Sequence, residues 1–244
     1  MMIMEGVKQM ETTVGCSIEE MLAYRFRFYD LLRRIFLWKL PPGLFSELVS
    51  AANQENDETS SECAHEAALK GALKGVLADQ LMSYYRDIEI EYTRLFLGPR
   101  HLPAPPYESV YRSPQKLMMQ DVTIDVRSTY RDNGFQVSNL NQEPDDTIGI
   151  ELEFMCALSG ASVDAYGAND TKKLARLLAT QREFCDLHLS KWVPQFCDDI
   201  ARSTQSGFWK GVAQCTREFV QQELVELETL CASFPISPDK PTQG

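Results

Sequence analysis

Two adjacent carboxylates, Asp145 and Asp146, follow Glu143 and Pro144 and are the side chains of this sequence most suited to chemistry. Paired acids can move protons as a general acid and base, or they can attract a cationic ligand. Side chains of neighbouring residues at a helix start diverge by about 100 degrees, so these two carboxylates cannot easily share one proton or one substrate atom. The pair is therefore a better candidate for binding a cation than for catalysis.

The acidic pair lies in a stretch that has no basic residues. From Asp132 to Thr171 there is no Lys or Arg but there are eight acidic residues, in a chain of 244 residues with a formal net charge of -11. On charge alone, the ordinary interpretation of such a run is a solvated surface. The acidic balance argues against a nucleic-acid partner, because proteins of that class cover phosphates with clustered Lys and Arg, and it favours a basic partner.

A second candidate for binding is the proline-rich loop 99–114. Its prolines are expected to exclude a helix and to disfavour strand pairing, and they reduce the entropy lost when the loop is held in one shape. Between Leu102 and Tyr111 the loop combines apolar, aromatic and hydrogen-bonding groups. These residues fit either a binding surface or a rigid connector packed on the core.

Other kinds of site are not indicated. The sequence has no nucleotide-binding glycine motif, and Gly71 and Gly75 lie in a helical stretch where small residues four apart allow close packing of another helix. A carboxylate-bridged metal site needs two E-x-x-H pairs, whereas Glu62 and His65 form one, and His65 is interpreted as a surface residue. The seven cysteines contain no C-x-x-C and are interpreted as free thiols near the core. We therefore predict no catalytic residue, no metal site and no cofactor.

The elements that must position these segments are helices. Apolar residues spaced by three and four predict a helix over 18–40, with Ser17 as its N-cap and Glu20 completing a capping box. No segment combines strand patterning with paired turns, so we predict an all-α fold. Further helices are predicted over 44–52, 64–82, 84–97, 114–132, 148–158, 171–203 and 208–233.

The chain is also expected to be a cytoplasmic protein without stable membrane insertion. No apolar run reaches the roughly 18 residues that a membrane span needs. Residues 1–10 include Glu5 and Lys8, where a signal peptide has an apolar centre.

Three segments have a more specific pattern. The first is EYTRLFLGP over 91–99, continuing into PPYESVY over 105–111, and the second is EPDDTIGIELEFM over 143–155. The third is F-x-x-x-H-L-x-x-W-x-x-x-F over 184–196. Together and in this order they resemble the TorD/DmsD family of redox-enzyme maturation chaperones. That family usually has a histidine after the acidic pair, so roles that depend on it are not transferred to Thr147, which stands in its place.

The resemblance implies how the chain is organised. It implies an N-terminal helical part over 1–134, a hinge with the acidic motif over 135–147, and a C-terminal helical part over 148–234. Residues 235–244 are expected to form a disordered tail. The resemblance also implies a monomer or a domain-swapped dimer.

The resemblance further implies a function without catalysis. Such chaperones bind the twin-arginine signal peptide and the precursor of a molybdopterin-containing oxidoreductase, of the DMSO or TMAO reductase type, and hold it until the cofactor is inserted and export follows. A twin-arginine peptide presents two guanidinium groups beside an apolar stretch, so its receptor needs carboxylates beside an apolar groove. Glu151 and Glu153 are second choices among the acids. The expected peptide-binding residues are Leu95, Phe96, Gly98, Pro106, Tyr107, Glu108, Ser109, Pro144, Asp145, Asp146 and Thr147.

Three alternatives remain open at the level of sequence. The client can be a nitrate-reductase-type catalytic subunit instead of an exported precursor. The protein can also be a nucleotide- or metal-dependent enzyme with an unrecognised helical site. A purely structural helical adaptor is the third alternative, and it would be indifferent to a twin-arginine peptide.

Overall fold

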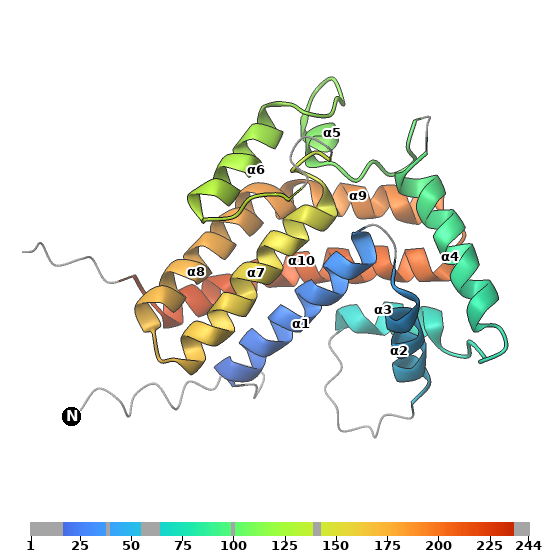
Figure 1. Cartoon of the computed structure of the whole chain (residues 1–244), viewed down its shortest axis with the longest axis horizontal. Helices are drawn as coiled ribbons and strands as arrows, with labels where there is room; N and C mark the ends of the chain where they lie inside the picture. Colours follow the sequence, from blue (N-terminus) through green and yellow to red (C-terminus); the bar gives the residue numbers. More distant parts are fainter. Residues whose placement is uncertain (1–16, 38–39, 55–63, 99–100, 139–142, 237–244) are drawn as a thin grey trace, which may run out of the picture.

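The computed structural model describes residues 17–37, 40–54, 64–98, 101–138 and 143–236, and these residues form helices and no strand (Figure 1). The predicted all-α fold is therefore confirmed. Pro99, residues 139–142 of the predicted hinge and residues 237–244 of the predicted tail lie outside the described residues. The helices are α1 (Ile18–Phe36), α2 (Pro42–Asn53), α3 (Ala64–Leu73), α4 (Leu81–Phe96), α5 (Glu108–Arg112), α6 (Asp121–Asp132), α7 (Ile148–Gly167), α8 (Thr171–Phe184), the π-helical turn η1 (Cys185–Leu189), α9 (Ser190–Ser203) and α10 (Gly207–Ser233).

The first helix begins where its capping residues predict. The Ser17 hydroxyl accepts the Glu20 N–H at 3.2 Å, and the Glu20 carboxylate accepts the Ser17 N–H at 2.8 Å, which completes the capping box. The helix ends at Phe36, four residues before the predicted end at Leu40. Its apolar stripe is buried as the spacing predicts, with Leu32 and Ile35 fully covered.

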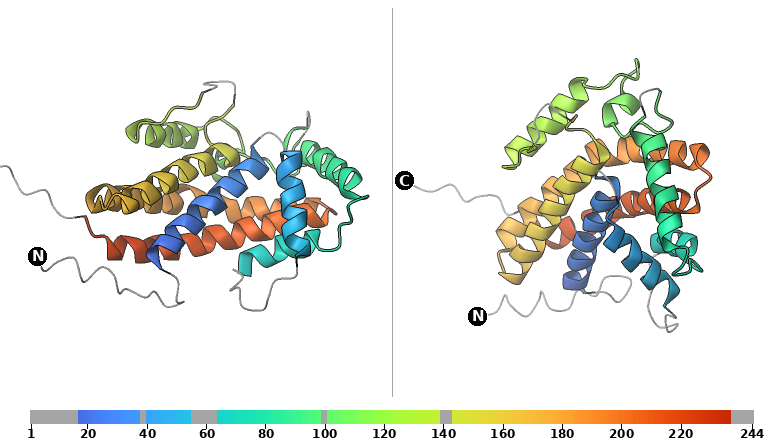
Figure 2. Two further views of the ribbon diagram at one scale, coloured as in Figure 1. Left: turned by 60° about the horizontal axis from the view of Figure 1, so that its bottom comes forward. Right: turned by 45° about the vertical axis from the view of Figure 1, so that its right-hand side comes forward.

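Helices from both predicted parts of the chain pack on one another. In Figures 1 and 2 α1 runs along α7, and α10 crosses the molecule beside α9 and reaches α3. Residues of α1 to α4 and of α7 to α10 belong to one hydrophobic core. The division at a hinge over 135–147 stays a prediction.

Several predicted boundaries are wrong for local reasons. The helix predicted over 148–158 continues to Gly167, and Gly160 lies within it at a position where a Cβ would come 3.1 Å from the Phe26 ring. The helix predicted over 64–82 is interrupted after Leu73, because Gly75 adopts a φ of +85° and turns the chain before α4. The helix predicted over 114–132 begins at Asp121, after a loop in which Met119 has a φ of +56°. Within the proline loop, five residues do form a helix, α5. The prolines exclude a long helix there, but Pro106 and Pro114 leave enough room between them for a single turn.

The predicted location of small-residue packing is also wrong. A Cβ at Gly71 would meet nothing within 4 Å, whereas a Cβ at Gly211 would lie 2.9 Å from the Ala68 carbonyl oxygen and 3.2 Å from the Ala72 Cβ. The close contact between α3 and α10 therefore depends on the glycine of the other helix. His65, interpreted from the sequence as a surface residue, is buried and packs edge-on against the Phe28 ring at 4.7 Å.

Gly211→Ala is expected to lower the free energy of unfolding by about 1–3 kcal/mol, since the added methyl meets a backbone oxygen that cannot rotate away. Gly71→Ala is the matched control in the other helix, and it should stabilise the protein by about 0.5–1 kcal/mol because its Cβ meets open space. Urea unfolding of the two variants measures the difference. Equal stabilities would show that α3 and α10 do not approach closely at Gly211.

Candidate functional site

The proline loop and the acidic motif, about forty residues apart in sequence, lie side by side. Tyr107 and Thr147 form an isolated antiparallel bridge. The Glu108 N–H donates to the Asp146 carbonyl at 2.9 Å, and the Ile148 N–H donates to the Pro106 carbonyl at 2.9 Å. Because α5 begins at Glu108 and α7 at Ile148, each segment supplies an acceptor for the first amide of the helix that follows the other.

Asp146 and Thr147 are buried at this junction. One Asp146 carboxylate oxygen accepts the Ser109 N–H at 2.7 Å, which places a negative charge at the N-terminus of α5, where the helix dipole favours it. The Thr147 hydroxyl donates to the Pro144 carbonyl at 2.7 Å and tightens the turn before α7. The predicted residues Ser109, Pro144, Asp146 and Thr147 are thus brought together, inside the protein.

Asp145 attaches α6 to the same junction. Its carboxylate accepts a hydrogen bond from Arg127 Nε at 2.7 Å and lies 2.5 Å from Arg127 Nη2 in an ion pair, and only 2% of the side chain is exposed. The Tyr130 hydroxyl donates to the Asp145 carbonyl at 3.1 Å. The partners Arg127 and Tyr130 were not predicted from the sequence, because only the folded chain brings α6 back onto the acidic motif.

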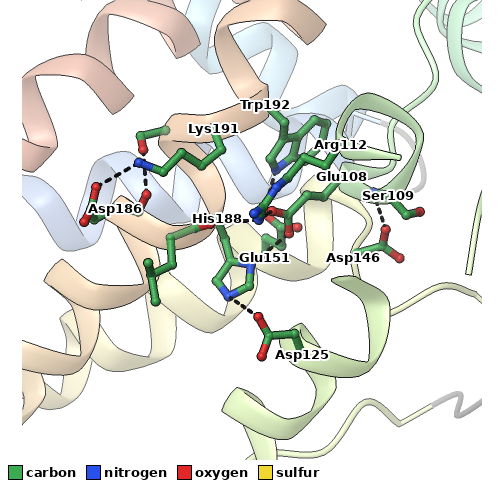
Figure 3. A network of polar contacts seen from close by, with 12 residues as sticks. Glu108, Ser109, Arg112, Asp125, Asp146, Glu151, Asp186, His188, Lys191 and Trp192 are labelled. Atoms are coloured by element: carbon green, nitrogen blue, oxygen red, sulfur yellow. Dashed lines mark hydrogen bonds and ion pairs between the residues drawn. The ribbon is translucent and has the colours of Figure 1, made fainter. Parts of the chain in front are cut away.

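Glu108 links α5 to the π-helical turn η1 (Figure 3). Its buried carboxylate contacts His188 Nδ1 at 2.9 Å and accepts a hydrogen bond from Arg112 at 2.6 Å. Arg112 also donates to the Leu187 carbonyl at 2.9 Å. The other nitrogen of His188 lies 3.9 Å from the exposed carboxylate of Asp125 on α6. The late histidine of the third sequence segment is therefore part of the same polar network as the proline loop.

Glu151, one turn into α7, is fully buried and accepts a hydrogen bond from the Trp192 indole at 3.1 Å. Its second oxygen has no hydrogen-bond partner among the described residues. Burial raises the pKa of this carboxyl well above its ordinary value, and the negative charges of Glu108 and Asp146 raise the pKa further. The Glu151 carboxyl therefore stays protonated at pH values at which an ordinary glutamate is ionised.

These contacts show what the acidic stretch does in the fold. Asp145, Asp146 and Glu151 of this stretch are buried, so a solvated surface is the wrong interpretation for these three side chains. Together with the buried Glu108 of the proline loop they join α5, α6, α7 and α9. The cationic partners of Glu108 and Asp145 come from the chain itself. Their direct contact with an incoming arginine stays a prediction and requires displacement of Arg112 or Arg127.

The apolar residues expected to line a groove divide into two groups. Leu95 and Phe96 belong to the core, where the Phe96 ring centroid lies 5.2 Å from that of Trp209. Leu95 nevertheless holds the loop through its carbonyl, which accepts the Ala104 N–H at 3.4 Å. Pro106 is buried and Gly98 is half-buried. Tyr107 is half-buried and lines a cavity.

This cavity, of about 240 Å³, lies between the proline loop, α5, the loop over 113–120 and α9. Next to it the loop exposes Leu117, Met118 and Met119, whose exposed fractions are 54%, 50% and 61%. Three consecutive apolar residues between Gln115 and Gln120 are a sequence signal for this surface, which sequence reasoning did not recognise. Asp199 could not be found from the sequence, because α9 reaches the loop only in the folded chain. Besides Tyr107, the residues that line the cavity include Leu102, Pro103, Pro105, Val110, Met118 and Asp199.

No group of three or more His, Cys, Asp or Glu side chains within the described part of the chain is arranged to hold a metal ion. None of the described helices has both the length and the apolar composition to cross a membrane.

Comparison with known proteins agrees with the sequence resemblance. A family model described as "Nitrate reductase delta subunit" matches residues 64–198, which include α3 to α8, η1 and most of α9. The probable Tat proofreading chaperone DmsD of Haemophilus influenzae is 26% identical over 142 residues, 58% of this chain and 63% of the relative. The Tat proofreading chaperone DmsD of Salmonella typhi is 29% identical over 143 residues, 59% of this chain and 63% of the relative.

The chaperone protein TorD of Vibrio cholerae is 26% identical over 137 residues, 56% of this chain and 60% of the relative. The matches thus span slightly less than two thirds of the length of these curated relatives. The match to the family model covers more than half of the sequence and contains both paired segments of the site. The chain therefore belongs to the TorD/DmsD family, whose model carries the description nitrate reductase delta subunit.

Proposed function

We propose that this protein is a cytoplasmic chaperone that binds the twin-arginine signal peptide and precursor of a molybdopterin-containing oxidoreductase, of the DMSO or TMAO reductase type. It holds the precursor until the cofactor is inserted and export can begin. Its contribution is binding, without a catalytic step. The proposal rests on the family and on one feature of the site, the apolar cavity beside the paired motifs.

That cavity suits the apolar part of a signal peptide. Prolines and Tyr107 make a rigid wall, and the exposed Leu117 to Met119 loop offers further apolar surface at its edge. A wall that is already ordered loses little conformational entropy when a peptide binds. Exposed consecutive apolar side chains of this kind commonly mark an interaction surface.

Apolar contacts should provide most of the affinity. Burial of one large apolar side chain contributes about 1.5–3 kcal/mol, whereas an exposed ion pair contributes about 0–1 kcal/mol. Charged groups near the cavity would then mainly set the orientation of the peptide and its selectivity.

Calorimetric titration with a synthetic peptide of two adjacent arginines followed by an apolar stretch tests the proposal. We expect saturable binding, and Met118→Ser should weaken it about fivefold to tenfold, because a half-exposed methionine loses its apolar contact with the peptide. Met82→Ser is the matched control, since Met82 is 67% exposed on α4 and does not line the cavity.

The control should bind the peptide as the unaltered protein does. Absence of binding to the unaltered protein would overturn the proposed function. An equal loss in both methionine variants would overturn the cavity as the binding surface.

The description of the family model favours a second candidate client, the catalytic subunit of a nitrate reductase. Such a chaperone would bind the folded or folding subunit and would not require a twin-arginine peptide. Capture of the bound protein from the native cytoplasm, followed by mass spectrometry, distinguishes the two clients.

A further inference from the structure

A second and larger cavity, of about 440 Å³, is lined by Glu143 at the start of the acidic motif. One of its walls is a face of α7 that includes Ile150, Glu153 and Phe154, at the spacing of successive helical turns. Phe135, in the segment after α6, also lines the cavity. Sequence reasoning named Glu153 as a second choice among the acids but assigned no binding role to Phe135, Ile150 or Phe154.

The floor of this cavity is aromatic. The Phe135 and Phe154 rings meet edge to face, with centroids 5.3 Å apart and an interplanar angle of 88°. Tyr130, which also lines the cavity, packs on Phe154 with a centroid distance of 4.7 Å. Aromatic faces attract cations, and the guanidinium group is the side-chain cation that stacks on them most often.

The rim of the cavity carries two carboxylates that differ from the buried acids of the motif. Glu143 is half-buried, and no described residue forms a hydrogen bond or ion pair with its carboxylate. Burial raises the pKa of Glu143 without an opposing contribution from a nearby cation. The Glu153 side chain is 56% exposed, and among the described residues its carboxylate forms one ion pair, at 3.5 Å from Arg33.

The two cavities are close to each other. Tyr107 lines the smaller cavity and bridges to Thr147, which lies four residues after Glu143 of the larger one. Burial raises the pKa of the Tyr107 hydroxyl, and the negative charge of Glu143 raises it further. A short extended peptide can therefore occupy one cavity with its apolar part and reach the other with neighbouring residues.

We propose that the larger cavity is the guanidinium-binding subsite, in which Glu143 and Glu153 bind the arginines of the client peptide against Phe135 and Phe154. This inference rests on the proposed function and deepens it. It transfers the selection of arginine from Glu108, Asp145 and Asp146, whose charges are buried in the fold, to acids that are accessible and weakly paired. An occupant with a guanidinium group fits the charge of the rim and the aromatic floor together.

The test compares three synthetic peptides with the same apolar stretch, preceded by two arginines, two lysines or two glutamines. Each is titrated calorimetrically against the unaltered protein, Glu143→Gln, Glu153→Gln and the control Glu47→Gln, which removes an exposed acid on α2. We expect the unaltered protein to prefer the arginine peptide to the glutamine peptide. Glu143→Gln should lower that preference about threefold to tenfold, Glu153→Gln should lower it less, and Glu47→Gln should not change it.

The arms of the experiment separate the two proposals. Failure of the unaltered protein to bind any of the peptides would overturn the proposed function. If the unaltered protein binds and Glu143→Gln keeps the full preference for arginine, the guanidinium subsite is wrong and the proposed function stands. Equal losses in Glu143→Gln and Glu47→Gln would also overturn the subsite, because the preference would then come from net charge alone. Thermal unfolding of each variant identifies any loss of folded protein.

Discussion

Replacement of Glu223 by alanine is expected to lower the free energy of unfolding by about 3–5 kcal/mol, a large fraction of the stability of an ordinary domain. Glu223 on α10 and Arg25 on α1 are both buried, and Arg25 Nε donates to both carboxylate oxygens at 3.0 Å. The Tyr29 hydroxyl donates to the same carboxylate at 2.9 Å. Removal of the carboxylate leaves the guanidinium charge unpaired in the core, which costs far more than the loss of an exposed ion pair.

Chemical denaturation measures this effect, and two variants control it. Glu228→Ala removes an exposed acid from the same helix and should change the stability by less than about 0.5 kcal/mol. The double variant Arg25→Met with Glu223→Leu removes both charges, and it should recover most of the lost stability because no buried charge remains unpaired. If Glu223→Ala is as stable as Glu228→Ala, the buried ion pair does not support the packing of α1 on α10.

Glu151→Gln is expected to change how stability depends on pH. The pKa of Glu151 is raised in the folded protein by burial first and by Glu108 and Asp146 second. Above the ordinary value of 4.5 the unfolded state releases a proton that the folded state keeps, so this group lowers stability as pH rises. The loss amounts to at most about 1.4 kcal/mol per pH unit, up to the pKa of the folded state.

A glutamine at this position keeps an acceptor for the Trp192 indole and cannot ionise. The stability of the variant relative to the unaltered protein should therefore be least at pH 4 and increase from pH 5 to pH 7. Glu153→Gln, two residues further along α7 and mostly exposed, should show no such increase. Denaturation at a series of pH values gives the difference directly, and parallel curves for Glu151→Gln and the unaltered protein would contradict a protonated Glu151.

His65 contributes to the same pH profile with the opposite sign, which is why the comparison must be between variants. Burial lowers the pKa of His65, so the unfolded state binds the extra proton first as pH falls below 6.5. Stability from this group is therefore lost on acidification. The difference between Glu151→Gln and the unaltered protein cancels it.

Local signals predicted most helices correctly because they depend on neighbours in sequence. The capping box at Ser17 and the spacing of apolar residues in α1 required no information about the rest of the chain. The long segments over 171–203 and 208–233 were predicted within a residue or so of the observed helical boundaries. The errors at Gly75, Met119 and α5 concern backbone conformations that depend on tertiary contacts or on a single turn.

The candidate site was predicted less completely. Sequence reasoning named the proline loop and the acidic motif together, and the structure joins them through Tyr107 and Thr147. Asp145 and Glu143 belong to one motif, and nothing in the sequence predicts that Asp145 is buried while Glu143 is half-buried. The distinction depends on Arg127, which reaches Asp145 from α6.

The sequence by itself determined the all-α class, the main helices, the family and the two segments that form the site, because periodicity, capping and motifs are local properties. Only the tertiary structure decided which acidic side chains are buried and paired within the protein and which remain accessible to a ligand. A carboxylate's environment depends on the distant residues that surround it, here Arg112 and His188 for Glu108 and Arg127 for Asp145. Desolvation and pairing of charges are properties of the packed chain, so carboxylates that look alike in the sequence acquire different roles.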